Sequence, residues 1–313
     1  SRPVSTADEL HAVARSSSGL DDALAQLIVE GVSSAQDPSA VFLLPSQTSS
    51  CELVNGLLLD AYSQDRFDHP CKSVLLVDPG VVIYPGTLET WSQIGRDLTD
   101  ALANGASALL AAQRICPTFR GTIPTDIDRC RLHLVSFVMP RLPCPAEKLQ
   151  EISRKRHSSF SRRIAVNNDR VFIELSASEM TSEPAGERAT STALISIGEF
   201  GDTSSMERME RAAQCMASVR AALKNGYVPG GGAILVDAAR WLSDRPVDDP
   251  VITAGIEVLR KALVSPARIL IDSAGELGPH HVETMLDDSS SGIVFDLRER
   301  RLCSAEAAGI LDA

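Results

Sequence analysis

The chain has 313 residues, 44% of them hydrophobic and 23% charged, so its composition is that of a globular protein long enough for two or three domains. Its net charge of −11 argues against broad nucleic-acid binding, and no apolar run approaches the roughly 20 residues that a membrane-spanning helix needs. The seven cysteines are scattered and include no C-x-x-C pair, which is typical of reduced, structural thiols in an intracellular compartment and predicts no zinc site.

The first half of the chain predicts alternating helices and strands. Residues 5–32 have the spacing of two helices, the first capped by Ser5 or Thr6, whereas residues 52–59 fit either type of element. Apolar residues at intervals of three and four predict a helix over 86–105. Short continuous apolar runs predict buried strands at 40–44, 73–78, 106–112 and 131–139. Such alternation is the mark of an α/β layer.

The second half of the chain is mainly helical in its pattern. Two short apolar runs flank Asn167 and Asn168 and predict a β-hairpin, whereas the polar stretch 176–190 predicts a loop. Strands are then predicted at 192–198 and 291–296, and helices at 206–223, 234–242, 251–263 and 267–273, with Pro266 as the break between the last two.

The segment NGYVPGGGA, residues 225–233, joins two of these helices. Three glycines after a proline fit neither a helix nor an ordinary strand, because glycine permits positive φ angles and close backbone approach and proline fixes the start of the turn. Two interpretations are open at this point. The segment is either a tight turn between helices or a bare loop that admits a ligand beside the next helix N-terminus.

This segment resembles the E-G-[IV]-V-P-G-G-G motif of the group I chaperonins, the 60-kDa ring-forming chaperonins of bacteria, mitochondria and plastids. Further segments resemble the family in the same order along the chain: ALISIG at 193–198, RAAL at 220–223, PARILIDSAGE at 266–276 and GILD at 309–312. The loop together with the distant GILD segment is the most specific part of the resemblance, and the N-terminal half matches by order and pattern.

The resemblance implies a multidomain fold that is α/β in one part and all-α in another. Residues 1–50 correspond to the start of a small intermediate domain and of an apical domain, and 51–175 to an apical-like α/β domain. Residues 176–200 correspond to the return through the intermediate domain, and 201–313 to a partial, helical, equatorial-like domain.

Several departures from the family pattern bear on ATP hydrolysis. The resemblance begins after the family's phosphate-binding G-D-G-T-T-T segment, so we expect no phosphate loop and no Mg²⁺-binding aspartate in this chain. The catalytic aspartate of the family's R-V-E-D-A-L motif corresponds to Gln214 in RAAQCM, and a glutamine cannot act as the carboxylate that orients or deprotonates water. If the chain is instead part of a longer protein, the missing segments are explained but Gln214 is not.

What the resemblance retains of a nucleotide site is its adenine side. The family's G-Y-N-A becomes VFDL at 294–297, and the vestigial adenine-side positions are Gly230, Gly231, Gly232, Asp296, Ile310 and Asp312. The resemblance also implies a groove for a substrate or partner on the apical-like domain. Its candidate contacts are Leu88, Trp91, Ile94 and Leu98, although core packing explains the same stripe equally well.

The resulting prediction is a chaperonin-60-like protein that has lost ATPase activity and serves as a scaffold or binding subunit of a larger assembly, with no catalytic residue, metal or cofactor. The alternative is a fragment of an ATP-dependent folding chaperonin subunit, whose cofactors would be ATP and Mg²⁺. The expected partners are other protein subunits and client polypeptides, with no membrane and no direct nucleic-acid binding. The resemblance favours the mitochondrial matrix over a plastid or a bacterial cytoplasm.

Overall fold

The computed structural model describes residues 1–19, 21–35, 37–38, 40–63, 73–104, 107–127, 131–137, 163–167, 170–174, 190–198, 202–245 and 248–313. These residues form two compact units. Ser1–Val29 and Gln214–Ala313 make one, which we call the terminal unit because it contains both ends of the chain, and Glu30–Ala213 make the other, the central unit. The division into four segments that the sequence suggests stays a prediction.

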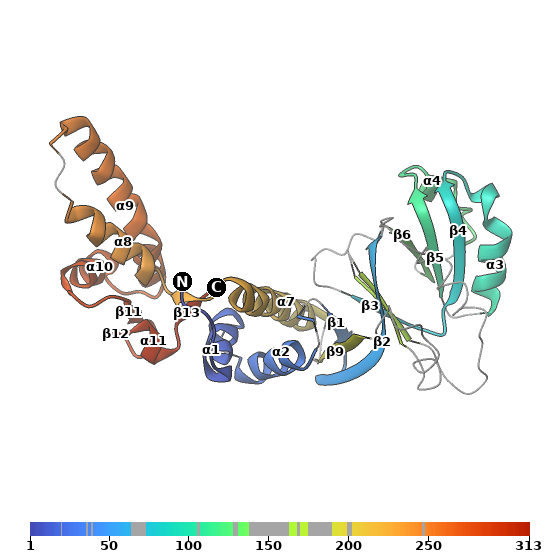
Figure 1. Cartoon of the computed structure of the whole chain (residues 1–313), viewed down its shortest axis with the longest axis horizontal. Coiled ribbons are helices and arrows are strands. Elements are labelled where there is room, and N and C mark those ends of the chain that lie inside the picture. The colour runs from blue at the N-terminus through green and yellow to red at the C-terminus, as the bar shows by residue number, and fades with distance from the viewer. Residues whose placement is uncertain are drawn as a thin grey trace. The chain divides into compact units, whose positions relative to one another are not determined.

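The central unit is built on a sheet that has nine strands among the described residues (Figure 1). The long strand β2 joins two parts of this sheet, because it pairs antiparallel with β8 and β9 and, at its C-terminal end, with β6. The strands are β1 (Val41–Ser46), β2 (Ser50–Ser63), β3 (Val74–Val77), β4 (Gly80–Leu88), β5 (Ala108–Ile115), β6 (Leu132–Phe137), β7 (Arg163–Val166), β8 (Arg170–Glu174) and β9 (Thr190–Gly198).

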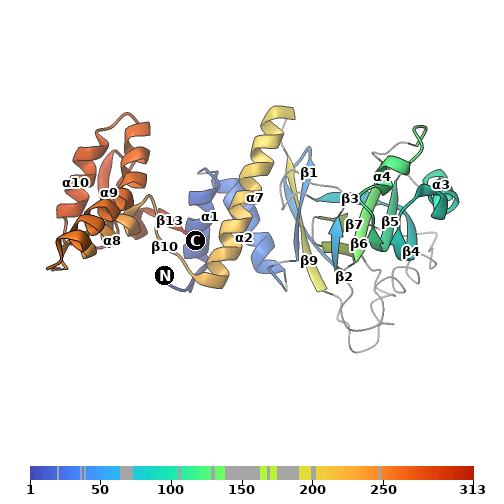
Figure 2. The same ribbon diagram turned by 90° about the horizontal axis from the view of Figure 1, so that it is seen from above.

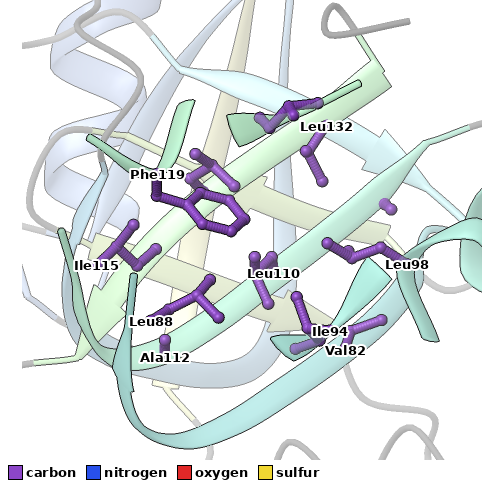
Figure 3. Packing of buried hydrophobic residues seen from close by; sticks show 12 residues of the cluster. Val82, Leu88, Ile94, Leu98, Leu110, Ala112, Ile115, Phe119 and Leu132 are labelled. Atoms are coloured by element: carbon purple, nitrogen blue, oxygen red, sulfur yellow. The ribbon is translucent and has the colours of Figure 1, made fainter. Parts of the chain in front are cut away.

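The strand β5 separates two hydrophobic cores of the central unit. Because successive side chains of a strand point to opposite faces, Leu110 lies in one core and Leu109 in the other. The first core contains Leu98 of α3 (Gly95–Asn104) and Phe119 of α4 (Phe119–Thr122) (Figure 3). Burial on both faces explains why the sequence of this strand is a continuous apolar run rather than an alternating one.

The terminal unit is mainly helical. Its small sheets are β10 (Val228–Pro229) with β13 (Leu311–Asp312), and β11 (Ile293–Asp296) with β12 (Arg301–Ser304). Helices α8, α9 and α10 lie together (Figure 2) and share a core with Phe295 of β11. Among the described residues no helix is long and apolar enough to cross a membrane. The boundary between the two units falls within α2 and α7. The helices that lie wholly or partly in the terminal unit are α1 (Ala7–Ser17), α2 (Asp22–Ser34), α7 (Asp202–Asn225), α8 (Ala233–Ser243), α9 (Pro250–Ser273), α10 (Gly278–Asp287) and α11 (Ala305–Ala308).

The N-terminal segment is tied to the C-terminal part of the terminal unit. The backbones of Arg2 and Tyr227 exchange two hydrogen bonds of 2.8 Å, and the Tyr227 hydroxyl donates to Glu9 over 2.9 Å. Glu9 also completes a capping box with Thr6, which confirms one of the two caps predicted for α1. Hydrogen bonds from the Ser5 backbone and from Tyr227 lower the pKa of Glu9.

Two predictions of local structure are wrong. Residues 80–88 form the strand β4, so the helix predicted from residue 86 begins only at Gly95, after the 3-10 turn Trp91–Gln93. Parallel pairing of β4 with β5 outweighs the helical spacing of Leu88. Pro266 lies inside the continuous helix α9, where it removes one backbone donor while Ala267 and Ile271 remain packed in the core. The loop predicted at 176–190 falls outside the described residues except for Thr190, which is the first residue of β9.

Candidate functional site

The glycine loop of the terminal unit is held between β10 and β13. Val228 and Pro229 pair with Asp312 and Leu311, and the backbone N–H of Gly230 donates to the carbonyl of Ile310 over 2.9 Å. The two most specific motifs of the resemblance, NGYVPGGGA and GILD, are therefore neighbours in space, although about 80 residues separate them in the sequence.

Two glycines of the loop occupy conformations that other residues rarely adopt. Gly231 has φ of 62° and Gly232 has φ of 83°. A Cβ atom on Gly231 would lie 2.6 Å from Cγ2 of Val294, and one on Gly232 would lie 2.9 Å from Cβ of Ala267. The bare backbone thus lets β11 and α9 approach the loop closely, so the tight-turn interpretation accounts for a large part of this sequence.

A pocket of about 370 Å³ opens beside Gly231 and lies wholly within the terminal unit. Its volume is within the range of small-molecule sites, at the lower end. Its walls are largely apolar, and its polar side chains are those of Arg15, Ser16, Asp296 and Arg298. The remaining lining residues are Gly19, Gly231, Leu270, Ile271, Val294, Phe295, Leu297, Ala308, Gly309 and Ile310.

Two of the polar side chains of the pocket, Asp296 and Arg15, have partners in the protein. Oδ1 of Asp296 accepts hydrogen bonds from the backbone N–H groups of Arg298, at 2.9 Å, and Glu299, at 3.3 Å. These bonds fix the turn between β11 and β12. Nε of Arg15 lies 2.7 Å from Oδ1 of Asp22. The pocket is therefore a preformed apolar hollow with a few positioned polar groups at its edge.

Asp237 is a structural carboxylate that no pattern in the sequence singles out. Its Oδ2 accepts from the backbone N–H of Gly292 and the hydroxyl of Ser291, both at 2.8 Å, and its Oδ1 accepts from Arg240 at 2.6 Å. The carboxylate therefore fixes the chain just before β11, the strand that forms one wall of the pocket. An acidic residue near the start of a helix gives no sign in the sequence that it reaches a turn some 55 residues away.

The structure places three of the six adenine-side positions in the lining of this pocket. Gly231, Asp296 and Ile310 line it, and Gly230 lies next to Asp312, since a Cβ atom on Gly230 would be 3.0 Å from Oδ1 of Asp312. Asp312 is exposed as a residue, but partial burial of its carboxyl group raises the pKa of that group. Gly232 is not a lining residue and instead faces α9.

Gln214 lies on α7, where its side chain is exposed, and it is not among the residues that line the pocket. It is the first residue of the C-terminal segment of the terminal unit.

The candidate groove residues require a correction. Leu88, Ile94 and Leu98 are 0%, 3% and 0% exposed and belong to the core between α3 and the parallel strands (Figure 3), and Trp91 is partly buried against them. Leu88, Ile94 and Leu98 fill the interior of the central unit, so these three side chains do not line a surface that a partner could contact. Of the two explanations of the stripe, core packing is the one that the geometry supports.

No cluster of three or more histidine, cysteine, aspartate or glutamate residues with metal-site geometry occurs in the described part of the chain. His281 instead packs on Phe295, with ring centroids 4.1 Å apart, and its Nε2 lies 3.8 Å from Glu276.

Comparison with known proteins relates the chain to the chaperonins. No family model matches it. Over 144 residues, which are 45% of this chain, it is 31% identical to "Chaperonin GroEL" of Neorickettsia risticii and 32% identical to "Chaperonin GroEL 2" of Cereibacter sphaeroides. These matches cover 26% and 27% of the relatives, so the chain matches about a quarter of their length.

A crystal structure of a group III chaperonin in the open state is similar at a TM-score of 0.49 and 15% identity, over 99% of this chain and 69% of that one. The sequence matches make the chain chaperonin-60-like, as the motifs predicted. The predicted combination of an α/β part and a helical part is also confirmed.

Proposed function

We propose that the chain is a chaperonin-60-like subunit that does not hydrolyse ATP and that serves as a structural component of a larger protein assembly. The observation that carries this proposal is Gln214, which stands where the resemblance places the catalytic aspartate. A neutral amide can hold water by hydrogen bonds, but it cannot supply the negative charge that a general base or a metal-orienting carboxylate requires.

The pocket supports the same proposal. Its lining is mostly apolar, with Arg15 and Arg298 as cationic side chains, and Arg15 is paired with Asp22. A triphosphate needs a run of converging backbone N–H groups and a metal held by carboxylates. None of the described residues that line the pocket forms such an arrangement, and most of the lining side chains are apolar.

Exposed apolar side chains on the terminal unit support the assembly role. Val251, Val258 and Leu277 are 78%, 71% and 72% exposed. Exposed apolar side chains that gather in a patch commonly mark an interface. We accordingly propose that this unit has protein partners.

We also propose that the assembly lies in the mitochondrial matrix, because this is the compartment that the resemblance favours. Cell fractionation with an antibody to the chain tests the compartment.

ATP turnover by the purified protein is the decisive measurement for the loss of ATPase activity. We expect no turnover above a buffer blank in the presence of Mg²⁺, and no gain in the Gln214→Asp variant. Turnover that disappears in Gly231→Val, where the new side chain would meet Val294 in the pocket wall, would overturn the proposal. A matched control is Gly121→Val, because nothing lies within 4 Å of a Cβ atom at that position of the central unit.

The second candidate function is that of an ATP-driven folding subunit seen in part. The observation in its favour is that Gly231, Asp296 and Ile310 converge on one pocket. Calorimetric titration separates the two functions. The folding subunit requires ATP to bind more tightly than adenosine, since the phosphates supply most of the binding energy. For a site limited to its adenine side we expect equal and weak binding of both.

A further inference from the structure

The pocket of the terminal unit has a buried apolar floor. Ile271, Val294 and Phe295 line it and are only 3%, 2% and 5% exposed. Ile271 and Phe295 also belong to the core that α8, α9 and α10 share, and Val294 belongs to a small core with Ala305 of α11. Close packing on the far side holds these side chains in place, so the hollow of about 370 Å³ is a preformed one.

Two polar side chains of the lining are open to a ligand. Arg15 is paired with Asp22, and Oδ1 of Asp296 accepts two backbone N–H groups. The hydroxyl of Ser16 and the guanidinium of Arg298, in contrast, make no hydrogen bond or ion pair with any residue that the structure describes. Arg298 is exposed, so its charge lies at the mouth of the pocket. A ligand would therefore meet an apolar floor and, above it, one cation and one hydroxyl without partners.

The chemistry of these two groups selects a carboxylate. A guanidinium donates two parallel N–H groups to a carboxylate, and a serine hydroxyl can supply a further donor. A cationic ligand is disfavoured, because Arg298 repels it and Asp296, the acidic residue of the lining, is already engaged at Oδ1. The volume is at the lower end of small-molecule sites, which favours a short apolar body over a long lipid chain.

We propose that this pocket binds a small apolar carboxylate of the size of a medium-chain fatty acid. The apolar body lies against Ile271, Val294 and Phe295, and the carboxylate lies at Arg298 with Ser16 as a second donor. The proposal goes beyond the loss of ATPase activity and does not rest on it, since it concerns what the pocket holds rather than what the chain hydrolyses.

Calorimetric titration of the purified chain with hexanoate, octanoate and octanol at neutral pH tests the ligand class. We expect a Kd on the order of 100 µM for octanoate. Each buried methylene should tighten binding by about fourfold, so hexanoate should bind about fifteenfold more weakly. Octanol should bind about two- to fivefold more weakly than octanoate, because it lacks the charge that an exposed arginine attracts. No binding of octanoate up to about 5 mM would overturn the proposal.

Substitution of Arg298 tests the carboxylate contact. Arg298→Gln should weaken octanoate to the level of octanol and leave octanol unchanged. Arg301→Gln is the matched control, because Arg301 is also exposed and lies on the same β11–β12 hairpin, but it does not line the pocket. We expect no change in either Kd for this variant. Equal weakening of octanoate by both variants would mean that general charge attraction, rather than a contact with Arg298, governs binding.

Two neighbouring residues of α9 test the location. Leu270 lines the pocket and is 43% exposed, so Leu270→Trp places a larger side chain in its mouth without disturbing the core. We expect the Kd of octanoate to rise at least about tenfold. Ile269→Trp is the matched control, because Ile269 is 64% exposed and is not a lining residue, and it should leave the Kd unchanged. Equal effects of the two variants would place binding elsewhere and overturn the proposal.

Adenosine is the competing occupant in the same experiment. Adenosine that binds more tightly than octanoate, and loses this binding in Leu270→Trp, would make the pocket a nucleoside site and overturn the carboxylate proposal. Circular dichroism establishes that each variant keeps its helix content. ATP turnover of the same samples reports separately on the proposed function: octanoate binding together with turnover overturns the loss of ATPase activity alone, and neither binding nor turnover overturns the carboxylate proposal alone.

Discussion

The region around α3 of the central unit and α9 of the terminal unit have similar apolar spacing and end in opposite surroundings. Ile94 and Leu98 are almost wholly buried, because the parallel strands β4 to β6 cover them. Val251 and Val258 on α9 are 78% and 71% exposed, although their spacing is also helical. Helical periodicity therefore identifies an apolar face, but what covers the face is decided by elements far away in the sequence.

The largest effect that separates the two regions is expected from truncating a buried leucine. Leu98→Ala deletes side-chain volume from a core with no exposed surface, so we expect the free energy of unfolding to fall by about 2–5 kcal/mol. Val258→Ala on α9 should change it by no more than about 0.5 kcal/mol, because Val258 is exposed in the monomer. Urea unfolding at low protein concentration measures both. Equal effects would contradict the assignment of Leu98 to the core.

A second comparison uses two glycines of the terminal unit with nearly the same backbone conformation. Gly232 has φ of 83° and Gly275 has φ of 80°. Alanine at either position adopts an unfavourable left-handed conformation that costs about 1–2 kcal/mol. At Gly232 the new Cβ atom would also lie 3.0 Å from backbone atoms of Ala267, whereas at Gly275 nothing lies within 4 Å.

We therefore expect Gly232→Ala to lower the free energy of unfolding by on the order of 3 kcal/mol and Gly275→Ala by about 1 kcal/mol. Thermal unfolding measures the two variants side by side. If both variants lose the same stability, close approach of α9 does not explain Gly232.

Much of the fold could be predicted from local sequence. The strands at 40–44, 73–78 and 106–112 and the hairpin beside Asn167 were identifiable, because continuous apolar runs and turn residues are local signals. The strand β4 was not, because its apolar residues run into the helical spacing that follows. The path of α9 through Pro266 depends on packing on both sides of the proline, which the local sequence does not reveal.

The candidate site was predictable only in part. Glycine-rich segments and GILD pointed to Gly231 and Ile310, which the structure brings to one pocket. Arg15, Leu270 and Arg298 line the same pocket because of the way α1, α9 and the β11–β12 turn assemble. The spacing of these three residues in the sequence does not predict that they share a pocket. Asp237 is a further example, because its role is defined by the backbone N–H of Gly292.

A smaller effect is expected in the ion pairs of the central unit, which contrast with the apolar packing of its core. Arg163 donates to Glu174 over 2.6 and 2.9 Å and to Glu52 over 2.8 and 2.9 Å. The Glu174 side chain is 11% exposed and that of Glu52 is 55% exposed. Hydrogen bonds to Glu174 and then to Glu52 raise the pKa of Arg163, so the guanidinium stays charged.

We expect Glu174→Gln to lower the free energy of unfolding by about 1–2 kcal/mol and Glu52→Gln by less than about 0.5 kcal/mol, because water screens the more exposed pair. The hydrogen bonds from Arg163 lower the pKa of Glu52. Its contribution is therefore present above the unfolded-state pKa of about 4.3 and is lost as the pH falls through the lower folded-state value. Urea unfolding between pH 3 and pH 7 measures both variants, and a larger loss for Glu52→Gln would contradict the difference in burial.

The smallest expected effect concerns the reactivity of two thiols. Here the partly exposed group lies in the central unit and the buried one in the terminal unit. Cys116 of the central unit accepts hydrogen bonds from the Thr118 side chain and backbone, and these lower its pKa. Cys215 on α7 is buried in the terminal unit, where its Sγ donates to the carbonyl of Ala14 over 3.3 Å, and burial raises its pKa to about 11. Only the thiolate is alkylated, so at pH 8 Cys116 should react with iodoacetamide and Cys215 should stay unmodified in the folded protein.

Peptide mass spectrometry over a time course measures both sites, with urea-unfolded protein as the control in which both are modified. Thr118→Val should slow the reaction of Cys116 by about two- to fivefold, because its pKa returns toward the ordinary value. Alkylation of native Cys215 at the rate of Cys116 would mean that the packing of α7 on α1 opens readily.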